Sequence, residues 1–197
     1  MTRKQLSFLV ILASSLVIIA ILFLTTGEGE KLIKRRAGVE EANLPMGAVE
    51  IPTQKITLFF LGEEDSLLHP EEREIRQTAS VVEAARLVVN ELLRGSQQGL
   101  ISPFPPRVKL REIYLTDNGL AYVDFSRELS ETHSLGATSE MMAVYAVVSS
   151  LTYNFKEIKK VFFLIDGRER ETLSGHVNLR RPFTPLPELI ASSDNKD

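Results

Sequence analysis

The chain has 197 residues, of which 44% are hydrophobic and 25% are charged, and its formal net charge is -3. These fractions lie in the ordinary globular range, so they exclude a collagen, a wholly disordered chain and a polytopic membrane protein. The chain has no cysteine, which excludes disulfides, thiolate metal sites and a lipid-modified cysteine. Its weak negative charge gives no reason to expect a nucleic-acid partner.

The amino-terminal part contains one long apolar run, residues 6–24, without a charged residue, Pro or Gly. At about 1.5 Å per residue, a helix of this length spans about 28 Å, close to the hydrocarbon thickness of a bilayer. The run is longer than the apolar core of a cleaved signal peptide, and no A-x-A pattern follows it. We therefore predict a short cytoplasmic leader at 1–5 and an uncleaved transmembrane signal-anchor at 6–25. Because long following domains translocate largely regardless of charge, we expect the remainder on the extracytoplasmic side.

A flexible linker and two strands follow the apolar run. Residues 26–53 are rich in Gly, Glu and Lys and lack an apolar period, which is typical of a tether. Residues 55–61 are rich in β-formers and predict a strand. Leu67 and Leu68, together with residues 73–77, predict a second strand that is broken in the middle.

A helix and a hairpin come next. Ser80 and Glu83 have the spacing of a capping box, and Gly95 is a typical residue just after a helix end, so they bracket a helix. The alternation at 108–115 predicts a strand, and the sequence Asp-Asn-Gly at 117–119 predicts a tight turn into a partner strand at 120–125.

The last third of the domain is predicted to contain one helix and two strands. A helix from about 138 to 153 is apolar over most of its circumference, which is typical of a helix buried on more than one side. The apolar run at 161–165 predicts a central strand, and residues 171–179 predict an edge strand. Residues 184–197 are predicted to be a disordered tail.

The element order ββαββαββ predicts one small α+β domain at residues 54–183. Hairpins dominate the connections, so we expect a mostly antiparallel sheet with both helices covering one of its faces.

No residue spacing in the chain is typical of catalysis or of metal or cofactor binding. His69, His133 and His176 lack metal-ligand spacing, and the chain contains neither a nucleophile elbow nor a phosphate-binding loop. A hydrolase would require Asp124 to meet His133 or His176 in a cleft. We therefore predict that the protein is not an enzyme and that it has no catalytic, cofactor or metal site.

Two groups of residues are candidates for partner binding. On the apolar helix, the candidates are Met141, Met142 and Tyr145, and simple burial in the core is the alternative. On the hairpin, exposed side chains would supply stacking and polar contacts, and ordinary cross-strand pairing is the alternative. The hairpin candidates are Lys109, Arg111, Tyr114 and Tyr122.

Short motifs spread over residues 55–183 resemble, in order and spacing, the GerMN domain of sporulation, spore-germination and other bacterial envelope proteins. The motifs are LHPEER at 68–73, ELLRG at 91–95, GLIS at 99–102 with Pro105, the hairpin at 108–126, VFFLIDG at 161–167 and GHVNL at 175–179 with Pro182. The resemblance implies a small module similar to the ring-building motifs of secretion-type assemblies, tethered to the outer face of a membrane.

From the resemblance and the apolar run together, we predict a single-pass protein of the bacterial cytoplasmic membrane with its domain in the periplasm or extracytoplasmic space. The residues at 6–24 take the place of the lipid anchor seen in the family. The expected role is that of a non-enzymatic scaffold or adaptor in an envelope assembly, with envelope-protein partners or self-association. The alternative is a module that binds peptidoglycan or a small ligand.

Overall fold

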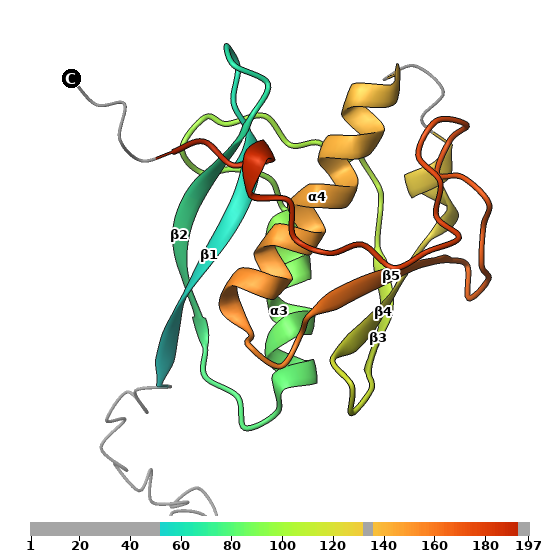
Figure 1. The fold of residues 1–197 in the computed structure, drawn as a ribbon. Coiled ribbons are helices and arrows are strands. Elements are labelled where there is room, and N and C mark those ends of the chain that lie inside the picture. Colours follow the sequence, from blue (N-terminus) through green and yellow to red (C-terminus); the bar gives the residue numbers. More distant parts are fainter. Residues whose placement is uncertain (1–51, 132–135, 193–197) are drawn as a thin grey trace, which may run out of the picture. The chain divides into compact units, whose positions relative to one another are not determined.

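Five strands and two helices make up the domain in the computed structural model, which describes residues 52–131 and 136–192 (Figure 1). They are β1 (Thr53–Leu61), β2 (Leu68–Arg76), α3 (Val81–Leu93), β3 (Leu110–Leu115), β4 (Leu120–Phe125), α4 (Gly136–Asn154) and β5 (Lys160–Ile165). Two single 3-10 turns, Arg127–Ser130 and Pro187–Leu189, complete the order. The α+β class is as predicted.

The predicted leader, anchor and nearly all of the linker lie outside the described residues. Within 52–131 and 136–192, no helix is long and apolar enough to cross a membrane.

The first two strands form an antiparallel hairpin of their own. β2 is continuous, whereas the sequence predicts a broken strand. The reason lies at its inward-facing positions: Glu71 and Arg73 are buried there, followed by Ile75. Two charged residues on the buried face interrupt the apolar alternation by which a half-buried strand is recognised.

The other three strands form a second sheet in the order β3-β4-β5. β3 and β4 are antiparallel, but β4 and β5 are parallel and are connected through α4. Parallel strands need such a crossover, so this segment is a β-α-β unit. The prediction of a single sheet is therefore wrong, and β5 is an end strand instead of a central one. Residues 171–179 form no strand and contain only the bridge between Thr172 and Asn178.

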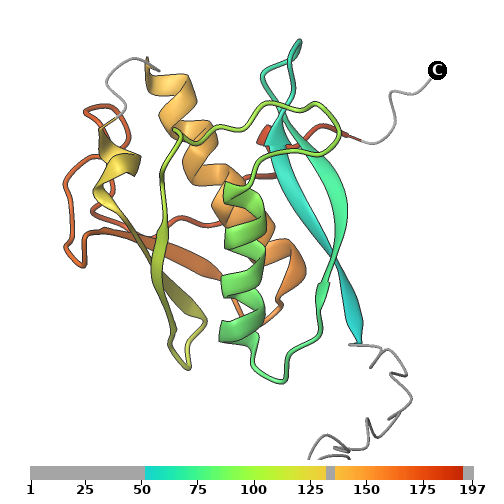
Figure 2. The same ribbon diagram turned by 180° about the vertical axis from the view of Figure 1, so that it is seen from behind.

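Both helices lie between the hairpin and the three-stranded sheet (Figures 1 and 2). The Ser80 hydroxyl accepts a hydrogen bond from the Glu83 amide at 3.4 Å, which confirms the predicted cap of α3. α4 packs against β1, α3 and β5, so burial on several sides accounts for its apolar circumference. The largest fully buried side chains come from both sheets and both helices and include Phe59, Leu92, Phe125, Leu151 and Phe163.

The carboxyl-terminal segment holds the two sheets together. Phe183 exchanges two backbone hydrogen bonds with Val161 at the outer edge of β5, at 2.9 and 2.8 Å, and its ring packs edge-on against Tyr145 and Phe163. The chain then crosses to β2, where the Ala191 amide donates to the Leu68 carbonyl at 2.9 Å (Figure 1). Within the predicted tail, Ala191 is thus hydrogen-bonded to β2, and Leu189 and Ile190 pack against the core.

Candidate functional site

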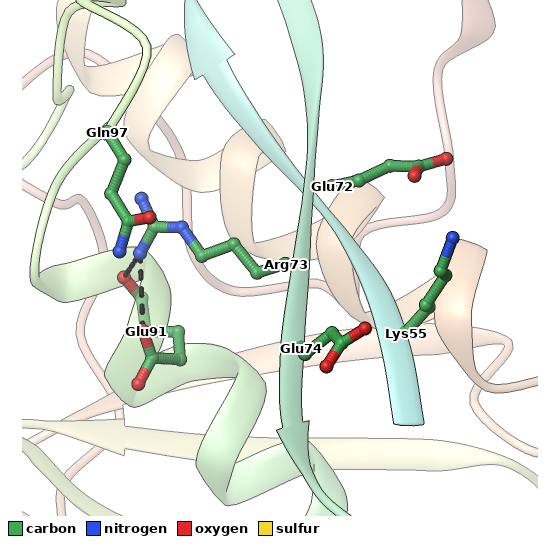
Figure 3. A pocket seen from close by; sticks show the side chains of 6 residues that line it. All are labelled: Lys55, Glu72, Arg73, Glu74, Glu91 and Gln97. Carbon is green, nitrogen blue, oxygen red and sulfur yellow. Dashed lines mark hydrogen bonds and ion pairs between the residues drawn. The ribbon is translucent and has the colours of Figure 1, made fainter. Parts of the chain in front are cut away.

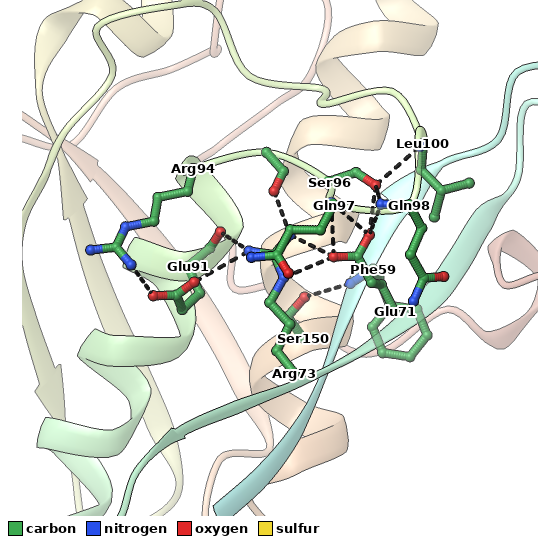
Figure 4. Close-up of polar contacts among 11 residues, drawn as sticks. Phe59, Glu71, Arg73, Glu91, Arg94, Ser96, Gln97, Gln98, Leu100 and Ser150 are labelled. Carbon is green, nitrogen blue, oxygen red and sulfur yellow. Dashed lines mark hydrogen bonds and ion pairs between the residues drawn. The ribbon is translucent and has the colours of Figure 1, made fainter. Parts of the chain in front are cut away.

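A buried ion pair on the inner face of β2 is the centre of a polar cluster that joins β2 to the end of α3 and the loop after it (Figure 4). Glu71 is 1% exposed and accepts hydrogen bonds from Arg73 Nε at 2.8 Å and Arg73 Nη2 at 2.5 Å. The same carboxylate accepts from the Ser96 hydroxyl at 2.6 Å and from the amides of Gln97 at 3.1 Å and Gln98 at 3.3 Å. All of its lone pairs are therefore occupied by protein donors, as a buried charge requires.

Arg73 connects this carboxylate to the end of α3. Its Nη1 donates to the Glu91 carbonyl at 3.1 Å and to the Glu91 carboxylate at 3.2 Å, and its Nη2 also donates to the Gly95 carbonyl. Carbonyls in the last turn of a helix lack intrahelical donors, so a cation is favourable there. The guanidinium also lies 5.4 Å from the centroid of the Phe60 ring. One arginine thus fixes the carboxyl end of α3 against the hairpin.

The hydrogen bonds around Glu71 also set its ionisation. Burial by itself would raise the pKa of the carboxyl, because it disfavours the charged form. The donors from Ser96, Gln97 and Arg73 outweigh this effect and hold the pKa of Glu71 below its usual value. The carboxylate is therefore ionised at neutral pH, and the cluster is a charged pair bonded to a loop.

A cavity of about 410 Å³ lies beside this cluster, along β2 (Figure 3). Its lining residues are Lys55, Glu72, Arg73, Glu74, Glu91 and Gln97. Glu72 and Glu74 extend to one side of β2, whereas Arg73 extends to the other side, toward Glu91 and Gln97 (Figure 3). The lining has three carboxylates against two cations, and Arg73 is already engaged. The cavity therefore suits a cationic ligand better than an anionic one.

Two further buried carboxylates hold loops in the same way. On α4, one carboxylate oxygen of Glu140 accepts hydrogen bonds from the amides of Ser174 and His176, at 3.2 Å each, and from the Val177 amide at 3.0 Å. The other oxygen lies 2.8 Å from His176 Nδ1. Burial opposes its ionisation, but the hydrogen bonds from His176 and Val177 outweigh burial and lower the pKa of Glu140. Asp124, on β4, accepts from the Gly167 amide at 2.8 Å.

These contacts separate the acid and the histidine that a hydrolase would need to combine. His176 bonds to Glu140, while Asp124 bonds to Arg111 Nε at 3.0 Å and to the loop after β5. His133 lies outside the described residues. Within 52–131 and 136–192, no group of three His, Asp or Glu side chains has a geometry that could hold a metal ion.

The helix residues predicted to bind a partner lie mainly against the core. Met142 is 2% exposed, so it is not available at the surface. Met141 and Tyr145 are half-buried and pack against the core cluster. The Tyr145 ring lies edge-on to Phe183 with centroids 5.9 Å apart, and burial raises the pKa of its hydroxyl. Simple burial thus explains most of the apolar character of α4.

The hairpin residues predicted to bind a partner lie at the surface of the three-stranded sheet. Tyr114 is 58% exposed and stands opposite Tyr122, which in turn stands opposite Phe162 with ring centroids 5.4 Å apart. Directly opposed residues share a sheet face, so three rings form one row. Lys109 is exposed, but Arg111 is held between Asp124 and Asp166, at 3.0 Å from each.

Sequence reasoning missed the role of Glu71 and Arg73. The available signal is their spacing: Glu71, Arg73 and the apolar Ile75 follow one another at every second position, which places all three on one face of a strand. Sequence reasoning also gave no binding role to Glu140, which the structure makes the acceptor for a distant loop.

The three motifs at 68–73, 91–95 and 99–102 meet around Arg73 and Ser96. Their contacts in the fold give a reason why the three motifs occur together in one sequence. A comparison with family profiles finds the Germane family, described as sporulation and spore germination, over residues 57–171. The chain belongs to this family. The predicted resemblance to the GerMN domain is thereby confirmed.

Solved structures that match this chain include two from Bacillus subtilis and one from Clostridium perfringens. The tandem GerMN domains of the sporulation protein GerM from Bacillus subtilis match with a TM-score of 0.52 at 19% identity, over 68% of this chain and 46% of that one. The first GerMN domain of GerM matches with a TM-score of 0.48 at 19% identity, over 72% of this chain and 99% of that one. A protein from Clostridium perfringens described as a lipoprotein matches with a TM-score of 0.49 at 24% identity, over 72% of this chain and 95% of that one. No curated protein matches the chain.

Proposed function

We propose that this Germane-family protein is a membrane-anchored extracytoplasmic protein whose domain acts as a non-enzymatic scaffold or adaptor in a bacterial envelope assembly of the sporulation or germination type. The observation that carries the proposal is the family match over residues 57–171, which covers most of the folded domain. A sporulation protein has a domain of this fold.

The tertiary contacts support binding over catalysis. Each of the buried carboxylates Glu71, Asp124 and Glu140 is bonded to backbone amides of a loop. Ionisable groups that are fully hydrogen-bonded in this way fix loops in place and are poorly suited to exchange protons with a substrate. Rigid loops on a small domain give a preformed surface, which lowers the entropic cost of binding a protein partner.

The apolar run at 6–24 supports the anchored, extracytoplasmic location, since its length matches the hydrocarbon thickness of a bilayer. Protease digestion of intact and of lysed spheroplasts tests this part of the proposal. We expect the domain to be degraded in intact spheroplasts and to stay in the membrane fraction after alkaline washing. Protection in intact spheroplasts would contradict the predicted orientation, and release by washing would contradict the anchor.

Crosslinking in native membranes, followed by mass spectrometry, tests the scaffold role. We expect the full chain to be crosslinked to one or a few envelope proteins, or to copies of itself. The matched control is the same chain with charged substitutions in the apolar run, which would prevent insertion. Capture of the same proteins by this control, or of none by the native chain, would count against the proposal.

The aromatic row favours a second candidate function, binding of peptidoglycan, because its outermost ring, Tyr114, is 58% exposed next to the half-buried Tyr122, and an exposed ring stacks well on sugars. Incubation of the full chain with purified sacculi tests this function. If the row binds, Tyr114→Ser will release the chain from sacculi, while Tyr153→Ser, at the other large exposed ring, will not. Absence of the native chain from the sacculus fraction would exclude this alternative.

A further inference from the structure

The outer edge of β1 is occupied by other parts of the domain from Thr57 to Leu61. The Thr57 amide donates to Asn154 Oδ1 at 2.9 Å, and Asn154 Nδ2 donates back to the Thr57 carbonyl at 2.6 Å. The Phe59 amide donates to the Ser150 hydroxyl at 3.1 Å. Leu61 exchanges two backbone hydrogen bonds with Ile101, at 3.0 and 2.8 Å. Side chains of α4 and one loop residue therefore replace a neighbouring strand.

The outer edge of β2 is open over most of its length. Thr57, Phe59 and Leu61 direct their backbone groups away from β2, so their register partners Glu72, Pro70 and Leu68 direct theirs away from β1. By the same alternation, the outward groups farther along β2 belong to Glu74 and Arg76.

Only one end of that edge is closed. The Leu68 carbonyl accepts from Ala191 at 2.9 Å, and Pro70 has no amide to offer. For Glu72, Glu74 and Arg76, no other part of the described chain bonds to the outward amides and carbonyls. Unpaired strand edges bind added strands readily, and this one lacks the covering that protects β1 from Thr57 to Leu61.

The acidic cavity lies along this open stretch. Its walls are Lys55, Glu72 and Glu74 on one side of β2, and Glu91 and Gln97 on the other (Figure 3). An extended chain placed against β2 would direct alternate side chains to these two walls. The wall beyond Arg73 is held rigidly by the hydrogen bonds around Glu71, so the groove is preformed.

The charges indicate which kind of chain fits. Glu72 has no ion-pair partner among the described residues, and Glu74 accepts only the Thr53 hydroxyl, at 3.1 Å. Arg76 is already bonded to Glu83 at 2.5 Å. Two-fold pairing of the whole stretch with a second copy would set Glu74 opposite Glu74, which is unfavourable, and each Glu72 opposite an Arg76 that already pairs with Glu83. A strand with Lys or Arg at alternate positions would instead face two carboxylates.

We propose that the edge of β2 from Glu72 to Arg76 is a site where an extended, Lys- or Arg-bearing segment of a partner protein adds as a third strand to the hairpin. This inference rests on the proposed scaffold function and specifies its partner by chemistry. The main chain of the segment would provide affinity, and its cationic side chains would provide selectivity.

The test uses the full chain in a non-ionic detergent and a capped nine-residue peptide of alternating Thr and Lys. Fluorescence anisotropy measures affinity, and hydrogen exchange with mass spectrometry measures protection of the segment that contains Glu72 and Glu74. We expect saturable binding that weakens with salt, together with slower exchange in this segment. A peptide methylated at alternate amides should not bind, because it cannot complete the ladder.

Two variants separate the backbone contribution from the charge contribution. Glu72→Pro removes an outward amide that no described residue uses, so the hairpin should stay folded while peptide affinity falls about tenfold or more. Glu72→Gln with Glu74→Gln should weaken binding about tenfold. Glu63→Gln with Glu64→Gln, in the exposed turn before β2, is the matched control and should leave affinity unchanged.

Equal affinity of Glu72→Pro and the native chain, or equal binding of the methylated peptide, would overturn the inference. So would a concentration-dependent dimer that Glu72→Pro dissociates, because the edge would then bind a second copy. Crosslinking in native membranes distinguishes this inference from the proposed function. If the Glu72→Pro chain captures the same partners as the native chain, the scaffold role stands and the edge site fails. If neither chain captures a partner, the proposed function itself fails.

Discussion

Replacing Glu71 with Gln should destabilise the domain by about 3–5 kcal/mol, although the two side chains have nearly the same shape. Glu71 accepts hydrogen bonds from Arg73, Ser96, Gln97 and Gln98. An amide has one oxygen that accepts and a nitrogen that only donates, so at least one of these donors would face another donor.

The magnitude follows from what is left behind. An unsatisfied buried donor costs about 1–3 kcal/mol, and the Arg73 guanidinium would lose its closest negative partner while staying only 7% exposed. The Glu91 carboxylate, 3.2 Å from Arg73 Nη1, would still compensate part of the arginine's charge. The expected loss of stability therefore stays within the range for broken buried ion pairs. Because small domains have a total stability of about 5–15 kcal/mol, the loss would be a large fraction of it.

Urea denaturation of the compact unit Ile51–Asp197, followed by far-ultraviolet circular dichroism, measures the change. Glu72→Gln is the matched control, since Glu72 is the next residue, is exposed and has no ion-pair partner in the described domain. We expect the control to stay within about 0.5 kcal/mol of the native unit. A loss below about 1 kcal/mol for Glu71→Gln would refute the assignment of this cluster as the clamp between β2 and α3.

The same variant should change how stability depends on pH. The pKa of Glu71 in the folded state lies below the 4.5 of an unperturbed glutamate. Its ionised form therefore contributes stability that is fully present above that value and is lost as pH falls through the folded-state pKa. Glu71→Gln should remove this part of the acid sensitivity. An unchanged slope of unfolding free energy against pH would contradict the stated cause of the shift.

Four further substitutions test other parts of the structure. Glu140→Gln should increase hydrogen exchange at residues 174–177 and reduce acid sensitivity, because the pKa of Glu140 is also lowered; unchanged exchange would contradict its role. Gly119→Ala should cost about 2–3 kcal/mol in thermal unfolding, since its φ is +84° and a Cβ would meet the Glu157 carbonyl at 2.8 Å. Gly99→Ala, with φ +85° in open space, should cost only about 1 kcal/mol. Asn154→Ala should expose the β1 edge and promote concentration-dependent aggregation, visible by light scattering.

Local sequence features predicted most element positions because the forces that set them act within a few residues. The Ser80 cap and the turn at 117–119 need only neighbouring amides and backbone conformations that a short segment can adopt. The prediction of an anchor at residues 6–24 is also local, because it depends only on the length and composition of that run. The GerMN resemblance also came from the sequence, and the family match over residues 57–171 confirms it.

Tertiary structure alone decided how these elements combine. Two separate sheets form because α4 connects β4 to β5 in parallel and supplies Asn154 and Ser150 to the edge of β1; both contacts join residues far apart in the chain. The cluster around Glu71 likewise depends on the loop after α3 returning to β2. A single sequence carries little signal for such pairings, since any strand edge can accept many partners and only packing of the whole domain selects one. The edge of β2 is open for the same reason: the fold has no remaining segment to cover it within the described residues.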